Sequence, residues 1–264
     1  FRERALASWS ERPFPTRRTE QWNYTPLQQL LKTDYQLAAT NVATDVDTKQ
    51  FIDVDAHRLV FIDGQFAADL SGELPHGVML FSHADSTQQS VISSLLGTIT
   101  AGNQHVFEPL NAALCSEGIF IAVDAGVTLD KPIYVVNVAT AANVLANVRI
   151  LISLGKNATA DVIEHFITQG DASDNFLNAI TEAQLGDNAA LNHYRINLED
   201  EQAQHIGGVH VDLHRDARFR GFAIALGSKL MRVDYQMNHR GPGASLDLQG
   251  IYLPRHNQVV DYHT

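Results

Sequence analysis

Three side chains in one short alternating stretch are of the types that bind transition metals. Residues 209–214 read Val-His-Val-Asp-Leu-His. Because successive side chains of a β-strand point to opposite faces, a strand here places His210, Asp212 and His214 on one face. Two imidazoles and a carboxylate suit zinc or ferrous iron, which makes this stretch a candidate metal site. The pattern equally fits the polar outer face of a strand whose three aliphatic residues point inward. The sequence identifies no facing residues that would complete the site.

Two further local features could take part in chemistry, and each also has a structural interpretation. The single cysteine, Cys115, could be a nucleophile or ligand, although a lone cysteine is more often a small buried hydrophobic residue. Arg215, Arg218 and Arg220 form a local basic cluster. That cluster could bind an anion or an acidic partner, or it could simply be a solvated wall of the fold.

Composition and missing motifs exclude several functional classes. The sequence has no Walker-type phosphate loop, dinucleotide-binding glycine motif, zinc-protease motif or nucleophile elbow. A net charge of −11 argues against nucleic-acid binding as the main role. One cysteine cannot form an internal disulfide or a multi-cysteine cluster site. No apolar run approaches the roughly 20 residues that span a bilayer, so we expect a cytoplasmic protein without membrane contact.

The first 115 residues are predicted to be a mixed region of helices and short strands. Helical spacing and breaking residues predict helices over 1–11, 26–32, 85–96 and 106–114. Strands are expected over 58–63 and 65–69, joined by an Asp-Gly turn, and over 78–81.

From residue 116 to 264 the pattern changes to short alternating strands separated by turns. Four alanines that each follow a turn, Ala158, Ala189, Ala217 and Ala244, are spaced by 31, 28 and 27 residues. A repeated turn–alanine–strand unit is typical of a β-solenoid, in which each coil buries the face of its neighbour. An antiparallel β-sandwich is the alternative, because its turns also recur regularly. We favour the solenoid and expect a mainly β protein.

The two ends of the sequence predict a fragment. The chain begins with Phe1 rather than methionine, and residues 259–264 resemble the middle of a strand. We therefore expect a β-helix core truncated at its C-terminal end, with exposed strand edges that favour self-association.

Three segments resemble one known family. The stretch Pro15–Leu27 resembles the N-terminal signature of the SufD family, in which Arg, Glu, Trp, Tyr and Thr recur at this spacing. The sequence Leu-Asn-Ala-Ala from Leu110, with the glycine, valine and proline pattern over 117–133, is similar to the start of the β-helix core shared by SufD and its paralogue SufB. The stretch Asp261-x-His263-Thr264 is similar to a segment of SufD cores. The resemblance extends over essentially the whole chain.

This resemblance implies a non-catalytic scaffold subunit for iron–sulfur cluster assembly, built on a right-handed parallel β-helix. It implies pairing with a SufB-like paralogue, joint action with a SufC-like ATPase through a C-terminal region absent here, and a possible homodimer in isolation. It also implies iron or a cluster held transiently at the complex interface, with no cofactor bound by this chain alone. The family's metal-linked histidine lies in a Cys-Ser-His-Gly-like segment that this sequence lacks. No catalytic, cofactor-binding or metal-binding residue is therefore carried over.

Two other functional classes remain open. One is a β-helical enzyme, either metal-dependent through His210, Asp212 and His214 or acting on carbohydrates along the solenoid wall. Trp9 and Trp22 both lie outside the solenoid region, which weakens the carbohydrate alternative. The other class is an interaction module with no link to clusters.

Overall fold

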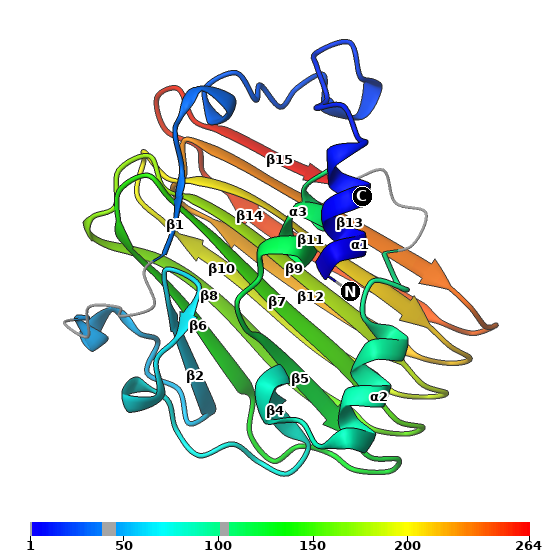
Figure 1. Cartoon of the computed structure of the whole chain (residues 1–264). Helices are drawn as coiled ribbons and strands as arrows, with labels where there is room; N and C mark the ends of the chain where they lie inside the picture. The colour runs from blue at the N-terminus through cyan, green and yellow to red at the C-terminus, as the bar shows by residue number, and fades with distance from the viewer. Residues whose placement is uncertain (1, 39–45, 101–105) are drawn as a thin grey trace.

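Two mainly parallel sheets form the walls of a β-solenoid of about five turns (Figure 1). The computed structural model describes residues 2–38, 46–100 and 106–264. Sheet A contains, in spatial order, β15 (Val259–His263), β13 (Leu230–His239), β11 (Gln204–Leu213), β9 (Phe176–Leu185), β7 (Val144–Leu154), β5 (Gly118–Val123) and β4 (Val78–Leu80), while β1 (Gln36–Leu37) pairs with β7. Sheet B contains β14 (Ser245–Tyr252), β12 (Arg218–Ala225), β10 (Ala190–Leu198), β8 (Thr159–Asp171), β6 (Ile133–Ala141), β2 (His57–Ile62) and β3 (Gln65–Phe66).

The predicted solenoid is confirmed, and the antiparallel sandwich is wrong. Strands within each sheet pair in parallel, as β8 and β12 do on either side of β10. Among the pairings between described residues, β2–β3 and β4–β5 are the antiparallel ones. From β5 to β13 consecutive strands alternate between the sheets, so each coil adds one strand to both walls.

The repeated turn–alanine unit joins each strand of sheet A to the next strand of sheet B. The third residue of each turn has a positive φ: Asn157 at 60°, Asn188 at 58°, Asp216 at 58° and Gly243 at 73°. Asn, Asp and Gly tolerate this left-handed backbone best, which explains why they occupy the position. The alanines that follow the first three turns are completely buried. A small side chain there lets successive turns stack.

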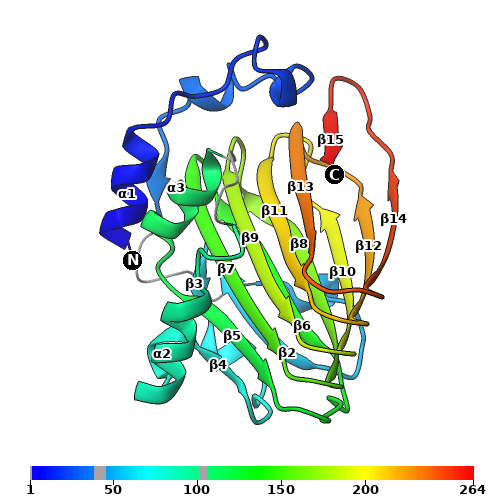
Figure 2. The same ribbon diagram turned by 90° about the vertical axis from the view of Figure 1, so that its right-hand side faces the viewer.

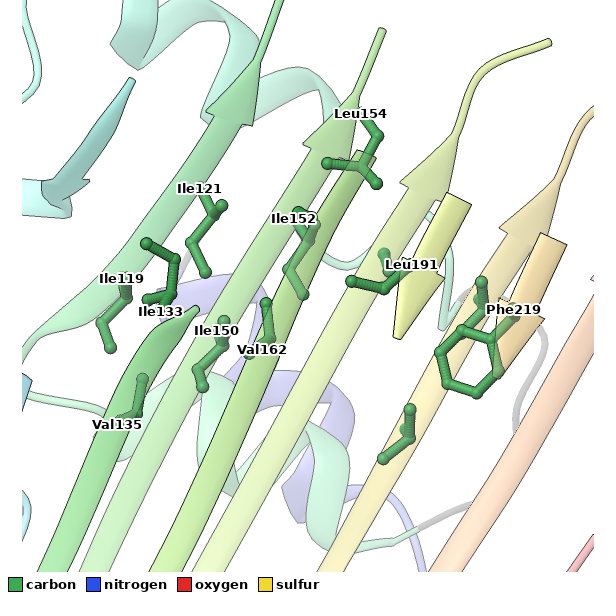
Figure 3. Packing of buried hydrophobic residues seen from close by; sticks show 14 of the residues in the cluster. Ile119, Ile121, Ile133, Val135, Ile150, Ile152, Leu154, Val162, Leu191 and Phe219 are labelled. Atoms are coloured by element: carbon green, nitrogen blue, oxygen red, sulfur yellow. The ribbon is translucent and has the colours of Figure 1, made fainter. Parts of the chain in front are cut away.

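Aliphatic side chains from both sheets fill the space between the walls (Figure 3). Ile150 and Ile152 of β7 face Ile133 and Val135 of β6 in one continuous buried cluster. Each such side chain contributes roughly 1.5–3 kcal/mol when it is fully removed from water. This interior explains the alternation seen in the sequence.

The N-terminal region covers the outer faces of the solenoid. Helices α1 (Arg2–Ser10), α2 (Ser86–Leu95) and α3 (Phe107–Leu114) lie on the outer side of sheet A (Figure 2). Segments between residues 46 and 70 cover the first part of the outer face of sheet B, over β2 and β6. Strands β2 and β4 of this region also extend the two sheets directly.

Most of the predicted N-terminal elements are confirmed, with two corrections. The Asp63-Gly64 hairpin and the three helices at 1–11, 85–96 and 106–114 are present. The predicted helix over 26–32 is wrong, because only a 3₁₀ turn forms at Leu30–Lys32. Leu27 and Leu30 instead insert into the buried cluster beneath α3, and this packing outweighs the local helix signals. The strand predicted over 65–69 ends at Phe66.

Candidate functional site

The predicted metal ligands lie on and just after β11. His210 and Asp212 lie on its outer side, whereas His214 lies in the turn that follows the strand. His210 is completely buried. The carboxylate of Asp212 accepts hydrogen bonds from Asn238 Nδ2 at 2.8 Å and Arg240 Nε at 3.1 Å. Within the described ranges, no group of three or more His, Cys, Asp or Glu side chains is arranged to hold a metal ion.

Cys115 is buried at the end of α3. Its Sγ donates a hydrogen bond to the carbonyl oxygen of Glu117 at 2.8 Å. Burial raises the pKa of the thiol to about 11, against the smaller opposing effect of Arg149. The thiol is therefore protonated at neutral pH, the state in which a cysteine is a poor nucleophile.

The predicted basic cluster belongs partly to the stack of turns. Arg215 pairs with Asp187 of the preceding turn at 2.8 Å, and Arg218 donates to Asn188 Oδ1 at 3.1 Å. These contacts join neighbouring coils on the surface. Arg220 lies exposed on the outer face of β12, as the strand pattern predicted.

A buried polar network inside the solenoid was missed by the sequence analysis. Glu164 of β8 accepts from His193 Nε2 at 2.7 Å and from Arg195 Nη1 at 3.3 Å. Arg195 Nη2 donates to His205 Nε2 at 2.8 Å, and His205 Nδ1 lies 3.0 Å from Glu199 Oε2. Since a guanidinium can only donate, Nε2 of His205 is the acceptor, and Nδ1 carries the proton toward Glu199. All five side chains are buried, so the network links three strands away from solvent.

Electrostatics keep Glu164 ionised in this interior. Burial alone would raise its pKa, but the attraction of Arg195 and the hydrogen bond from His193 outweigh that effect and lower it to about 2. The two-residue period of a strand, counted from the apolar Leu191, could have predicted that His193 and Arg195 point inward. No sequence signal indicates that Glu164 and His205 meet them there.

A second buried cation fastens the N-terminal segment to the late coils of the solenoid. Arg232 of β13 donates to the carbonyl oxygen of Gln21 at 2.6 Å, to Asp261 Oδ2 at 2.8 Å and to Thr25 Oγ1 at 3.1 Å. Its guanidinium carbon lies 4.0 Å from the ring centre of Trp22, and Thr25 also hydrogen-bonds to Asp261. We call these five residues the Arg232 latch. Two of the segments that resemble the SufD family, residues 15–27 and 261–264, therefore meet in space.

The third segment that resembles this family, which begins at Leu110, also joins separate elements. Asn111 of α3 donates from Nδ2 to the backbone oxygens of Val148 at 2.9 Å and Asn178 at 2.8 Å. Buried Arg149 of β7 pairs with Glu182 and with Glu108 of α3. These contacts hold α3 against the outer face of sheet A.

Comparison with protein families identifies both halves of the chain. Residues 137–264 match a family model described as SUF system FeS cluster assembly, SufBD core domain, and residues 1–135 match the SufBD protein N-terminal region. The chain belongs to the SufBD family. The resemblance stated from the sequence is thus confirmed.

Curated relatives are similar in sequence to almost the whole chain. A SufBD family protein of iron–sulfur cluster assembly from Synechocystis is 28% identical over 269 residues, and the iron–sulfur cluster assembly protein SufD of Escherichia coli is 27% identical over 254 residues. Each alignment covers 95% of this chain but 58% of the relative. Protein ABCI7, chloroplastic, of Arabidopsis thaliana is 20% identical, with 96% of this chain and 55% of that protein covered.

In this SufBD chain the charged side chains singled out above serve mainly to join elements. The interior network connects coils, Arg149 anchors α3, and the Arg232 latch anchors the N-terminal segment. None of the helices in the described ranges is long and apolar enough to cross a membrane. The result is a parallel framework whose coils and N-terminal segments are joined by buried polar contacts.

Proposed function

We propose that this chain is the scaffold-forming part of a non-catalytic SUF subunit that pairs with a SufB-like paralogue and acts with a SufC-like ATPase. The observation that carries the proposal is the match of both halves to SufBD family models. The SufD of E. coli, with 95% of this chain aligned, supports the same assignment. Because the chain spans 58% of that relative, its partners are proposed for the gene product that carries this sequence.

The architecture supports a scaffold. Parallel solenoids present long, rigid walls and strand edges, and unpaired edges are suitable for pairing with another β-protein. The buried charged side chains Glu164, Arg149 and Arg232 pair with residues of other elements and hold these elements together, which supports a non-catalytic role. Iron or a nascent cluster is then the cargo of the assembled complex, held transiently at the interface between subunits. We place this work in the cytoplasm.

Co-expression tests the proposal directly. The gene product carrying this sequence is produced with the SufB-like and SufC-like proteins of its host, and the mass of the complex is measured by light scattering during size exclusion. A stable assembly containing all three proteins is the expected result. Elution of this protein alone, while the other two associate, would contradict the proposal.

A second experiment tests where iron or the nascent cluster is held. Iron and acid-labile sulfide are quantified in the three-protein complex and in the isolated subunit after anaerobic reconstitution. We expect both elements in the complex and neither in stoichiometric amount on this subunit alone. Stoichiometric metal on the isolated protein, lost in His210→Ala, would instead support the metal-dependent enzyme.

A further inference from the structure

The N-terminal segment presents two arginines at the tip of a tight turn. Thr19 N donates to Thr16 O at 2.8 Å, which places Arg17 and Arg18 at the two central positions. The hydroxyl groups of the two threonines reinforce the turn, since Thr16 N donates to Thr19 Oγ1 and Arg18 N donates to Thr16 Oγ1. Both arginine side chains are exposed, and no ion pair joins either of them to another described residue. The turn therefore displays two guanidinium groups to solvent.

An aromatic side chain lies exposed a few residues further along the same segment. Tyr24 is 86% exposed, whereas Trp22 and Thr25 on either side are 3% and 2% exposed. The latter two residues belong to the Arg232 latch, so the backbone that carries Tyr24 is fixed to the solenoid. Burial in its own fold does not account for an aromatic ring in this position. Tyrosine and arginine are the residue types enriched at binding hot spots.

The charge of this surface is opposite to that of the molecule as a whole. The chain has a net charge of −11, but residues 12–27 contain three arginines and one acid, Glu20. This segment crosses the end of the molecule beside β15, in dark blue in Figure 2. An acidic partner is repelled by most of the protein and attracted to this part of it.

We propose that the exposed residues Arg17, Arg18 and Tyr24 of the N-terminal segment bind an acidic segment of a partner protein. The two guanidinium groups pair with carboxylates, for which their planar donors are well matched, and the exposed ring of Tyr24 further along the segment supplies an apolar contact. The latch fixes the backbone beside Tyr24, and the Thr16–Thr19 hydrogen bonds order the turn that carries the two arginines, so less backbone entropy is lost on binding. The overall negative charge disfavours nucleic acid as the occupant, because a polyphosphate is repelled over its whole length. This inference does not depend on the proposed role in cluster assembly.

A fluorescein-labelled octaglutamate peptide is the probe for this surface. Its binding to the gene product carrying this sequence is followed by fluorescence anisotropy at low ionic strength. Arg17→Glu/Arg18→Glu is expected to weaken binding by about tenfold or more, because two attractive contacts become repulsive. Tyr24→Ala alone is also expected to weaken peptide binding, but to leave the dependence of binding on salt unchanged.

The matched control is Arg218→Glu/Arg220→Glu, which makes the same change in net charge on β12. Thermal unfolding of each variant verifies that the fold is intact. An equal loss of affinity in both double variants would mean that only net charge matters and would overturn the proposal. So would absence of peptide binding by the unaltered protein, or preferential binding of a labelled oligothymidine over the peptide.

Discussion

Arg232 is the residue on which the attachment of the N-terminal segment depends. It is completely buried, and its guanidinium lies against the carboxylates of Asp234 and Asp261 and the ring of Trp22. Arg232→Met keeps much of the volume but removes the cation from two acidic groups. Because breaking a buried pair costs about 3–5 kcal/mol, we expect a loss of that size in the free energy of unfolding measured with urea. Arg220→Met, at an exposed position, should change it by less than about 0.5 kcal/mol. Equal effects would contradict the latch.

Glu164 makes the stability of the solenoid depend on pH in the acidic range. Its pKa falls from the ordinary 4.5 in the unfolded chain to about 2 in the fold, despite burial, because Arg195 and His193 stabilise the carboxylate. A lowered pKa contributes stability that is complete above pH 4.5 and is lost as the pH falls from 4.5 toward 2. Unfolding free energies measured across that range should therefore fall less steeply with acid in Glu164→Gln. Glu73→Gln, at an exposed position, should retain the slope of the unaltered protein.

Gly207 of β11 lies close to the backbone of β9 and to Arg195 of the interior network. A Cβ at Gly207 would lie 2.5 Å from the backbone oxygen of Ala179 and 2.7 Å from Arg195 Nη2. Gly207→Ala should therefore cost about 1–3 kcal/mol, as overpacking does, and lower the midpoint of thermal unfolding. At Gly72 the nearest atom would be 3.8 Å away, so Gly72→Ala is the matched substitution. If the two alanines are tolerated equally, the close approach is not what requires Gly207.

Regular elements were predictable because one short-range pattern determines them. In β7, Ile150, Ile152 and Leu154 alternate with the strand period, and this alternation alone predicts one wall of the core. The spacing of the turn–alanine repeat then gives the number of residues in each coil. The segment 26–32 was mispredicted because long-range packing of Leu27 and Leu30 overrides its local helix signals.

The polar contacts were less predictable because their partners lie on other coils. Asp212 has the same spacing whether it binds a metal or, as here, Asn238, which is 26 residues further along the chain. His193 meets Glu164 across 29 residues, and Arg232 meets Thr25 across 207. Strand periodicity gives the face on which each side chain lies. It does not give the neighbour that the stacking of coils brings to it.

The outer face of the molecule is covered unevenly. Helices α1–α3 lie on sheet A, but the N-terminal segments reach only the first strands of sheet B. On the outer face of sheet B, Ile163 of β8 lies beside Tyr194 of β10, which lies beside Phe222 of β12. An adjacent row of outward side chains ends at Ile251 of β14. Parallel sheets are normally buried on both faces. The outer face of β10, β12 and β14 is instead partly exposed.

This uneven cover, together with the edge strands β14 and β15, predicts that the 264-residue chain self-associates. Ile251 lies on edge strand β14 and is 52% exposed. Ile251→Lys places on that strand a charge of the kind that natural edges use against pairing, so it should lower the association seen by sedimentation velocity over a concentration series. Leu6→Lys adds the same charge at a residue 50% exposed on α1 and should leave association unchanged. Monodisperse monomers of the unaltered chain at high concentration would contradict the prediction. An equal effect of both lysines would mean that added charge alone opposes association, and that β14 has no special part in it.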